Sequence, residues 1–224
     1  MPRVSYQHQL DQLGTDVLYM SEVVLDRLRL ALAALEQKDE STARRVIKGD
    51  NEINDQYLDL ESDCIDLLAL QQPVASDLRF IAASFKIITD LERIADLAVN
   101  LADYSLAADT DALPEVDVQA IGTAVTEMVE DAMVAYADED AELCYNLADR
   151  DNVVDAQCEA ASETIVRDLL AREEAVENPD LEAQLADISR LLLTVRDLER
   201  IGDHAVNIAS RSLYMIQNDA DLLY

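Results

Sequence analysis

Apolar side chains recur at every third or fourth position along almost the whole chain. In the first stretch they stand at Leu10, Leu13, Val17, Met20, Val24, Leu28 and Ala31. This spacing is typical of the buried stripe of an amphipathic α-helix. Pro73, Pro114 and Pro179 favour helix ends, whereas Gly49 marks either a bend or a tolerated helical glycine. The pattern predicts six helices, at about 8–38, 41–71, 75–108, 115–138, 141–174 and 180–217.

A repeat divides the chain into two halves. Residues 90–102 and 197–209 are identical at ten of thirteen positions, at a spacing of 107. A second, weaker repeat relates residues 50–54 to residues 151–155, at a spacing of 101. Single long helices cannot bury their apolar stripes alone, so they must pack on one another. We therefore expect an all-α fold of two tandem, pseudo-twofold-related three-helix bundles, the first in residues 1–110 and the second in residues 111–224.

The composition narrows the class of protein. Gly and Pro number four each, which disfavours turn-rich all-β folds. Half of the residues are apolar, so the chain is globular, but 47 acidic and 17 basic side chains leave a net charge of −30. That charge disfavours direct binding to nucleic acid or to anionic membranes. An Asp-rich chain with three Lys resembles cytosolic proteins of halophiles, so we expect a halophilic archaeal source and mostly solvent-adapted carboxylates.

Cysteine usage and hydropathy indicate the compartment. Cys64, Cys144 and Cys158 form no CxxC pair, and small buried thiols in a reducing cytosol fit them best. The first residues lead into no apolar stretch of signal-peptide length, and the longest aliphatic run is residues 191–193. We expect a cytoplasmic protein with no inserted segment.

The repeated motif places acidic side chains in a stripe. Glu92 and Asp96, like Glu199 and Asp203, are four residues apart, and an Asn follows four residues later in both halves. Such residues share one helix face, which here borders the apolar seam, whereas Asp90 is expected to point well away. Neighbouring like charges near a helix interface need a compensating cation or proton.

The weaker repeat supplies polar side chains that could face these acidic stripes. Asp151 and Asp155 are also four residues apart, as are Asp50 and Asn54. On antiparallel neighbouring helices these pairs could face the acidic stripes. Four oxygen ligands suit a hard cation such as iron, manganese, magnesium or calcium. Solvated surface and salt bridging by nearby arginines remain open alternatives.

Signatures of catalysis are missing from the sequence. It has no Gly-rich phosphate loop, GxSxG, HExxH or CxxC motif. No Glu is followed three residues later by His, as in di-iron bundles, and only His8 and His204 are present. We interpret His204 as a solvent-facing residue and not as a ligand. We therefore expect a protein that is not an enzyme.

Three segments together resemble the PhoU family. They are residues 72–79 (Gln-Pro-Val-Ala-Ser-Asp-Leu-Arg), residues 90–96 and residues 197–209. The resemblance covers about residues 8–217 and implies a cytoplasmic, usually dimeric regulator that damps phosphate uptake. It also implies two partners, namely the ATPase subunit of a phosphate transporter and a sensor histidine kinase.

Some members of that family carry metal clusters on matching acidic motifs. The resemblance thus implies binding of iron, manganese, magnesium or zinc by Asp50, Glu92, Asp96, Asp151, Asp155, Glu199 and Asp203. Asn54 occupies the position in the first half that Asp155 has in the second half. The first-half site therefore has one charge fewer and should bind a metal ion more weakly. Two other functions stay open: an accessory subunit of a secondary phosphate carrier, and a metal-dependent helical-bundle enzyme.

Overall fold

The computed structural model describes residues 3–71, 73–107, 116–172, 181–219 and 222. Within these residues the chain forms six helices and no strand, as the apolar periodicity predicts. The helices are α1 (Arg3–Gln37), α2 (Glu40–Gln71), α3 (Ala75–Ala107), α4 (Val118–Asp138), α5 (Ala141–Arg172) and α6 (Leu181–Gln217).

Two helix starts differ from the sequence-based expectation. Helix α1 begins at Arg3 instead of near residue 8, because Tyr6 packs into the core and is only 7% exposed. Helix α4 begins at Val118 instead of near 115, because the Asp117 side chain caps it by accepting a hydrogen bond from the Ala120 amide at 2.9 Å. The expected boundary at residues 110 and 111 lies outside the described residues.

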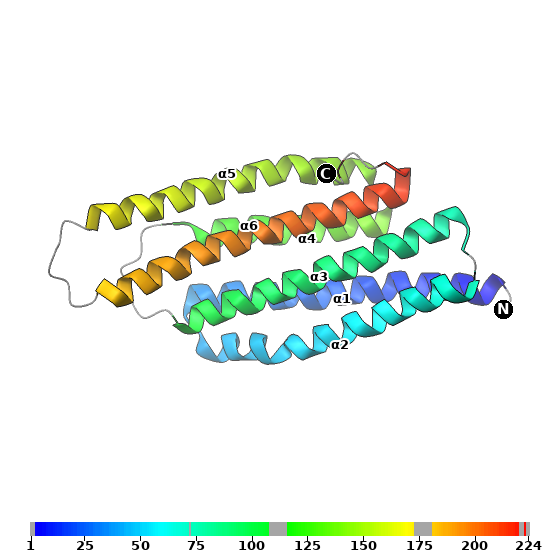
Figure 1. Cartoon of the computed structure of the whole chain (residues 1–224), viewed down its shortest axis with the longest axis horizontal. Coiled ribbons are helices and arrows are strands. Elements are labelled where there is room, and N and C mark those ends of the chain that lie inside the picture. Colours follow the sequence, from blue (N-terminus) through cyan, green and yellow to red (C-terminus); the bar gives the residue numbers. More distant parts are fainter. Residues whose placement is uncertain (1–2, 72, 108–115, 173–180, 220–221, 223–224) are drawn as a thin grey trace.

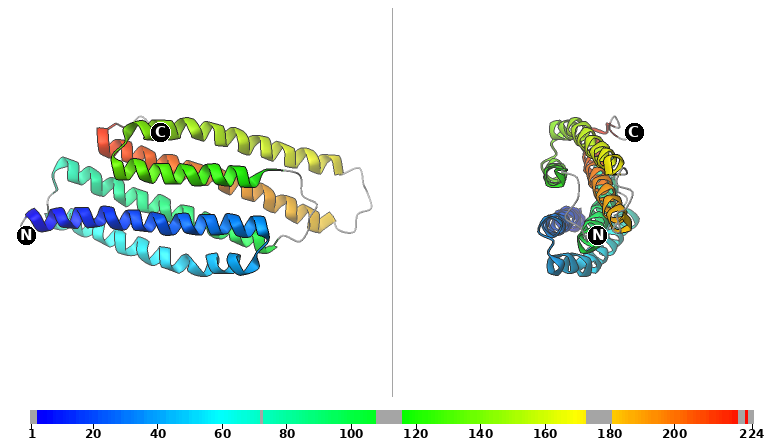
Figure 2. Two further views of the ribbon diagram at one scale, coloured as in Figure 1. Left: turned by 180° about the vertical axis from the view of Figure 1, so that it is seen from behind. Right: turned by 90° about the vertical axis from the view of Figure 1, so that its left-hand side faces the viewer.

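The six helices form two layers. Helices α5, α6, α3 and α2 lie side by side in that order, and α4 and α1 cover one face of this layer (Figures 1 and 2). Helices α3 and α6 run antiparallel at the centre and join the two three-helix halves (Figure 1). One continuous apolar core runs through both halves and includes Leu91, Ile94, Leu198 and Ile201. The acidic motifs therefore lie on the two central helices.

The duplication extends to the turns within each half. Lys38 and Glu139, 101 residues apart, both adopt left-handed backbone angles, with φ of 53° and 55°. Each is followed by an Asp whose side chain accepts amide hydrogen bonds, Asp39 from Ser41 and Thr42 and Asp140 from Leu143. Both halves thus connect their first two helices by the same type of turn.

Gly49 is a helical residue within α2 and not a chain break. The guanidinium of Arg27 on α1 occupies the space that a Cβ at Gly49 would need. The same Arg27 pairs with Glu52 at 2.7 Å. A larger residue at Gly49 would therefore require the Arg27 side chain to move.

None of the helices, over the parts of the chain that are described, is both long and apolar enough to cross a bilayer. Cys64, Cys144 and Cys158 are buried free thiols, as expected from their spacing.

Candidate metal centre

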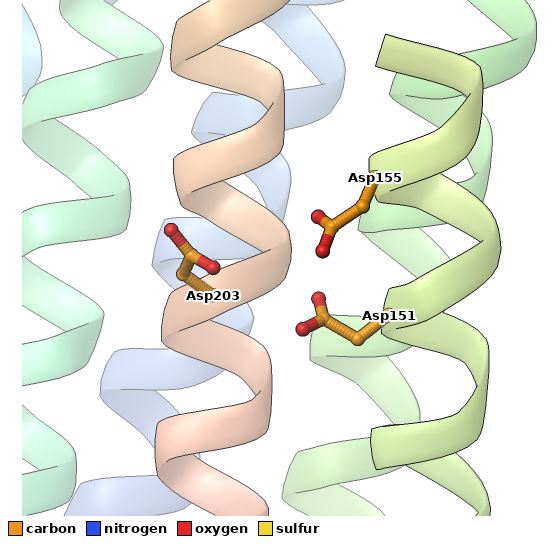
Figure 3. Close-up of side chains that lie close together, drawn as sticks. All are labelled: Asp151, Asp155 and Asp203. Carbon is orange, nitrogen blue, oxygen red and sulfur yellow. The ribbon is translucent and has the colours of Figure 1, made fainter. Parts of the chain in front are cut away.

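Three carboxylates of the second half meet between α5 and α6. Asp151 and Asp155 project from α5 toward α6, and Asp203 stands on α6 with one carboxylate oxygen turned toward them (Figure 3). One oxygen from each of the three lies within 4.8 Å of the other two. We call these residues, together with the adjoining Glu199, the second-half cluster.

The Asp151 carboxylate is the most constrained member of this cluster. Its Oδ1 atom is buried and has no hydrogen-bond partner. Burial raises the pKa of Asp151 to about 6, with further contributions from Asp155, Asp203 and Glu199. On α6, Gly202 leaves room for this oxygen, because a Cβ there would lie 3.2 Å from it. A buried carboxylate oxygen without a partner is commonly explained by an ordered water or an ion bound beside it.

Like charges dominate the surroundings of the other members. Burial, Asp155 and Asp203 raise the pKa of Glu199, and burial and Asp155 raise the pKa of Asp203. Among the described residues no ion pair reaches any of these four carboxylates. Arg200, the nearest candidate by sequence, instead approaches Asp197 at 3.8 Å. The cluster therefore has no ion-paired partner among the described residues, and His204 and Arg200 only partly oppose the rise in the pKa of Asp203.

The first half holds its acidic residues in a looser group. Burial and Asp96 raise the pKa of Asp50, and burial followed by Asp96 raises the pKa of Glu92. Arg93 contacts both members of the motif, Glu92 at 3.4 Å and Asp96 at 3.2 Å. Asn54 donates a hydrogen bond to Asp50 at 2.8 Å. We call Asp50, Glu92 and Asp96 the first-half group.

The two halves differ in how closely their carboxylates approach one another, and the number of acidic residues alone predicts this difference only in part. Of the seven acidic residues singled out by sequence, Asp151, Asp155 and Asp203 are brought within ligand distance of one another. Among the described residues no first-half trio meets that distance. Arg93 and Asn54 compensate the first-half carboxylates locally, so their oxygens need not converge.

The expectation that His204 faces solvent is wrong, and so is the expectation that Asp90 points away. Nδ1 of His204 lies 2.9 Å from Oδ1 of Asp90, and the two side chains are 17% and 13% exposed. They meet because α3 packs on α6 as well as on α1 and α2, which buries a second face. The sequence held a signal for this, since His204 corresponds to Leu97, a core residue of α3.

Asp197 is the counterpart of Asp90 in the second half, and the sequence analysis missed its role. Its carboxylate is fully buried and accepts hydrogen bonds from Asn100 at 3.2 Å and Tyr104 at 2.9 Å, both on α3. Arg196 donates from both Nε and Nη2 to Oδ1 of Asp197, at 3.1 and 2.8 Å. Asn207 donates to Asp90 at 3.4 Å, so the two Asp–Asn pairs cross between α3 and α6 symmetrically.

The donor set favours hard cations. All members are carboxylates, which suit iron, manganese, magnesium or calcium. Cys158 lies buried beside them, but burial and the charges of Glu199 and Asp155 raise its pKa to about 12, so its thiol is protonated at neutral pH. The residues present thus fit an oxygen-ligated metal.

Known proteins share both the sequence and this architecture. The family model described as PhoU domain matches residues 17–105 and 118–212. The phosphate-specific transport system accessory protein PhoU homolog 1 of Methanothermobacter thermautotrophicus is 32% identical to this chain, over 96% of this chain and 95% of that protein. The PhoU homolog of Pseudomonas aeruginosa is 31% identical, over 95% of this chain and 85% of that protein.

Two crystal structures have the same fold. PhoU from Pseudomonas aeruginosa superposes with a TM-score of 0.87 at 30% identity, over 96% of this chain and all of that chain. The phosphate transport system regulatory protein PhoU from Streptococcus pneumoniae superposes with a TM-score of 0.85 at 27% identity, over 96% and 98% of the two chains.

Proposed function

This chain belongs to the PhoU domain family, and from that premise we propose that it is an accessory protein that regulates phosphate transport. In this proposal it lowers phosphate uptake by binding the ATPase subunit of a phosphate transporter in the cytoplasm. The observation that supports the proposal most strongly is that the family match spans both three-helix halves. No catalytic step enters the proposal.

The second-half cluster is proposed to hold a divalent or trivalent cation. Asp151, Asp155 and Asp203 would supply the first ligands, with Glu199 beside them. The buried, unpartnered Oδ1 of Asp151 supports this assignment. Iron, manganese and magnesium are the candidate metals that the carboxylate ligands favour, and zinc is a further candidate from the family resemblance. The cation would relieve the repulsion between the carboxylates that α5 and α6 bring together.

The first-half group is proposed to be a weaker site. Asp50, Glu92 and Asp96 offer three charges, and a cation there would have to displace Arg93 from Glu92 and Asp96. The guanidinium of Arg93 is about half exposed, as is that of Arg200 on α6. Arg93 and Arg200 are proposed to form part of the surface that meets a partner.

The proposed partners are proteins. Besides the transporter ATPase, a sensor histidine kinase and a second copy of this chain are candidates. Exposed apolar side chains on the outer helices, Ile65 and Leu68 on α2 and Val166 and Leu170 on α5, support contacts with a protein surface. A secondary phosphate carrier is the alternative to the transporter ATPase.

A deletion strain grown at high phosphate tests the regulatory role. Phosphate uptake should stay high without the protein and return to low values on complementation. Arg93→Ala with Arg200→Ala should restore control only in part, with Arg44→Ala, an exposed arginine near the start of α2, as the matched control. Unchanged uptake in the deletion strain, together with no capture of a transporter ATPase by the tagged protein, would overturn the proposal.

A further inference from the structure

A hydrogen bond between His204 and Asp90 joins the two acidic sites across the central helices. His204 directly follows Asp203 of the second-half cluster, and Asp90 lies two residues before Glu92 of the first-half group. Nδ1 of His204 lies 2.9 Å from Oδ1 of Asp90. Because a carboxylate can only accept, the imidazole Nδ1–H is the donor. The bond is largely shielded from water, since both side chains are mostly buried.

The imidazole also influences a carboxylate of each site through space. The pKa of Glu92 is raised by burial and then by Asp96, and His204 opposes that rise. The pKa of Asp203 is raised by burial and then by Asp155, and His204 opposes that rise too. The His204 ring therefore lies within electrostatic reach of both sites.

In the other direction no histidine makes the corresponding link. The repeat places Leu97 where the second half has His204, and Leu97 is buried in the core. The corresponding carboxylate, Asp197, is held by Asn100 and Tyr104 instead. His204 thus bonds to the helix turn that carries the weaker site and directly follows a proposed ligand of the stronger one. Asn207, Asn100 and Tyr104 also bond across α3 and α6, but they lie four or more residues from the nearest proposed ligand of their own helix.

We propose that His204 is a positioning residue through which a cation at the second-half cluster strengthens cation binding at the first-half group. The inference rests on the metal binding proposed above. A cation held by Asp203 fixes that turn of α6, and the His204–Asp90 bond passes this restraint to the turn of α3 that carries Glu92. Part of the ordering that the weaker site requires is then already complete, which is positive coupling.

Manganese titrations of the full chain by calorimetry, in high KCl, test the coupling. Asp151→Asn with Asp155→Asn removes the second-half cluster from α5 and leaves the residues of α6 unchanged. The dissociation constant for Mn²⁺ at the first-half group should rise by about fivefold or more in this variant. In the His204→Leu background the same two substitutions should change it by less than about twofold.

Two further variants separate a specific link from general damage at the interface. Asn207→Ala removes the longer bond to the same Asp90 oxygen and should leave the coupling intact. Asp90→Ala breaks the His204 bond from α3 and should abolish the coupling, which provides a second test if His204→Leu does not fold.

Coupling that survives in both His204→Leu and Asp90→Ala would overturn the inference. So would first-half binding in the otherwise unchanged protein that does not respond to loss of the second-half cluster, although metal binding itself would then stand. If the unchanged protein bound no Mn²⁺, both the proposed metal binding and this inference would fail.

Discussion

Gly202 on α6 faces Asp151 on α5, and a Cβ at Gly202 would lie 3.2 Å from Oδ1 of Asp151. The corresponding residue in the first half is Ala95. Glycine therefore gives the second-half cluster a close approach of carboxylate to helix that the first half lacks.

Gly202→Ala should affect stability and metal binding in opposite directions. Alanine favours the helix by roughly 0.5–1 kcal/mol, and the Asp151 side chain can move by a few tenths of an ångström. The Tm of the metal-free protein should rise by a few degrees, while the dissociation constant for Mn²⁺ at the second-half cluster increases. Calorimetry of both variants measures the two effects, and unchanged metal affinity would contradict the proposed role of Asp151.

Asp151→Asn should stabilise the metal-free protein at alkaline pH. Burial raises the pKa of Asp151 to about 6 from 3.8, so the folded protein binds this proton more tightly than the unfolded chain. The resulting contribution to stability is complete below the unfolded pKa and is lost as the pH rises through about 6. The gain at pH 8 should be about 1 kcal/mol, reduced from the full linkage value by solvent screening, and close to zero at pH 4.

Thermal unfolding of the Asp151→Asn variant at the two pH values checks this dependence. Addition of Mn²⁺ at pH 8 should stabilise the unchanged protein more than the variant. An equal Tm difference at pH 4 and pH 8 would show that the substitution acts through packing instead.

Paired substitutions should rank the two metal sites. Glu199→Gln with Asp203→Asn should abolish most metal binding, because it neutralises two carboxylates of a cluster that has no ion-paired arginine among the described residues. Glu92→Gln with Asp96→Asn should remove only a weaker component, since Arg93 already compensates those charges. Elemental analysis after reconstitution measures both, and equal metal content in all three proteins would identify these carboxylates as surface adaptation.

Stability should rise steeply with salt. A net charge of −30 on a chain of 224 residues produces self-repulsion that screening and cation binding relieve. We expect a clearly higher Tm at about 3 M KCl than at about 0.1 M KCl, where screening is far weaker. Choline chloride at matched ionic strength distinguishes screening from specific cation binding, and identical Tm values in both KCl solutions would contradict halophilic adaptation.

The sequence predicted the helices well because their apolar stripes are long and regular. It also predicted which side chains share the faces of α5 and α6, since residues four apart lie on one side of a helix. Helix starts were predicted less accurately. An Asp such as Asp117 caps a helix only if its own backbone is not helical, and the sequence alone does not specify that. The spacing of residues within each helix was thus enough to predict the fold and most of the second-half cluster.

The interface between α3 and α6 was predicted poorly. A helical wheel with one apolar stripe assigns a single buried face, whereas α3 packs on three helices and buries Asp90 on another face. The relative position of two antiparallel helices depends on packing along their full lengths, which no local spacing encodes. The pairing of Arg93 with Glu92 and Asp96 likewise depends on side-chain rotamers.

The crossed pairs Asp90–Asn207 and Asp197–Asn100 have a consequence for the origin of the molecule. Each half carries both an Asp and an Asn of the pair, so a half on its own presents a self-complementary surface. Such a surface closes an isologous dimer about a twofold axis. The chain is in this sense a dimer fused into one polypeptide, and fusion allows one copy to diverge from the other. His204 in place of Leu97 is one such divergence, a polar link that two identical halves would carry twice or not at all.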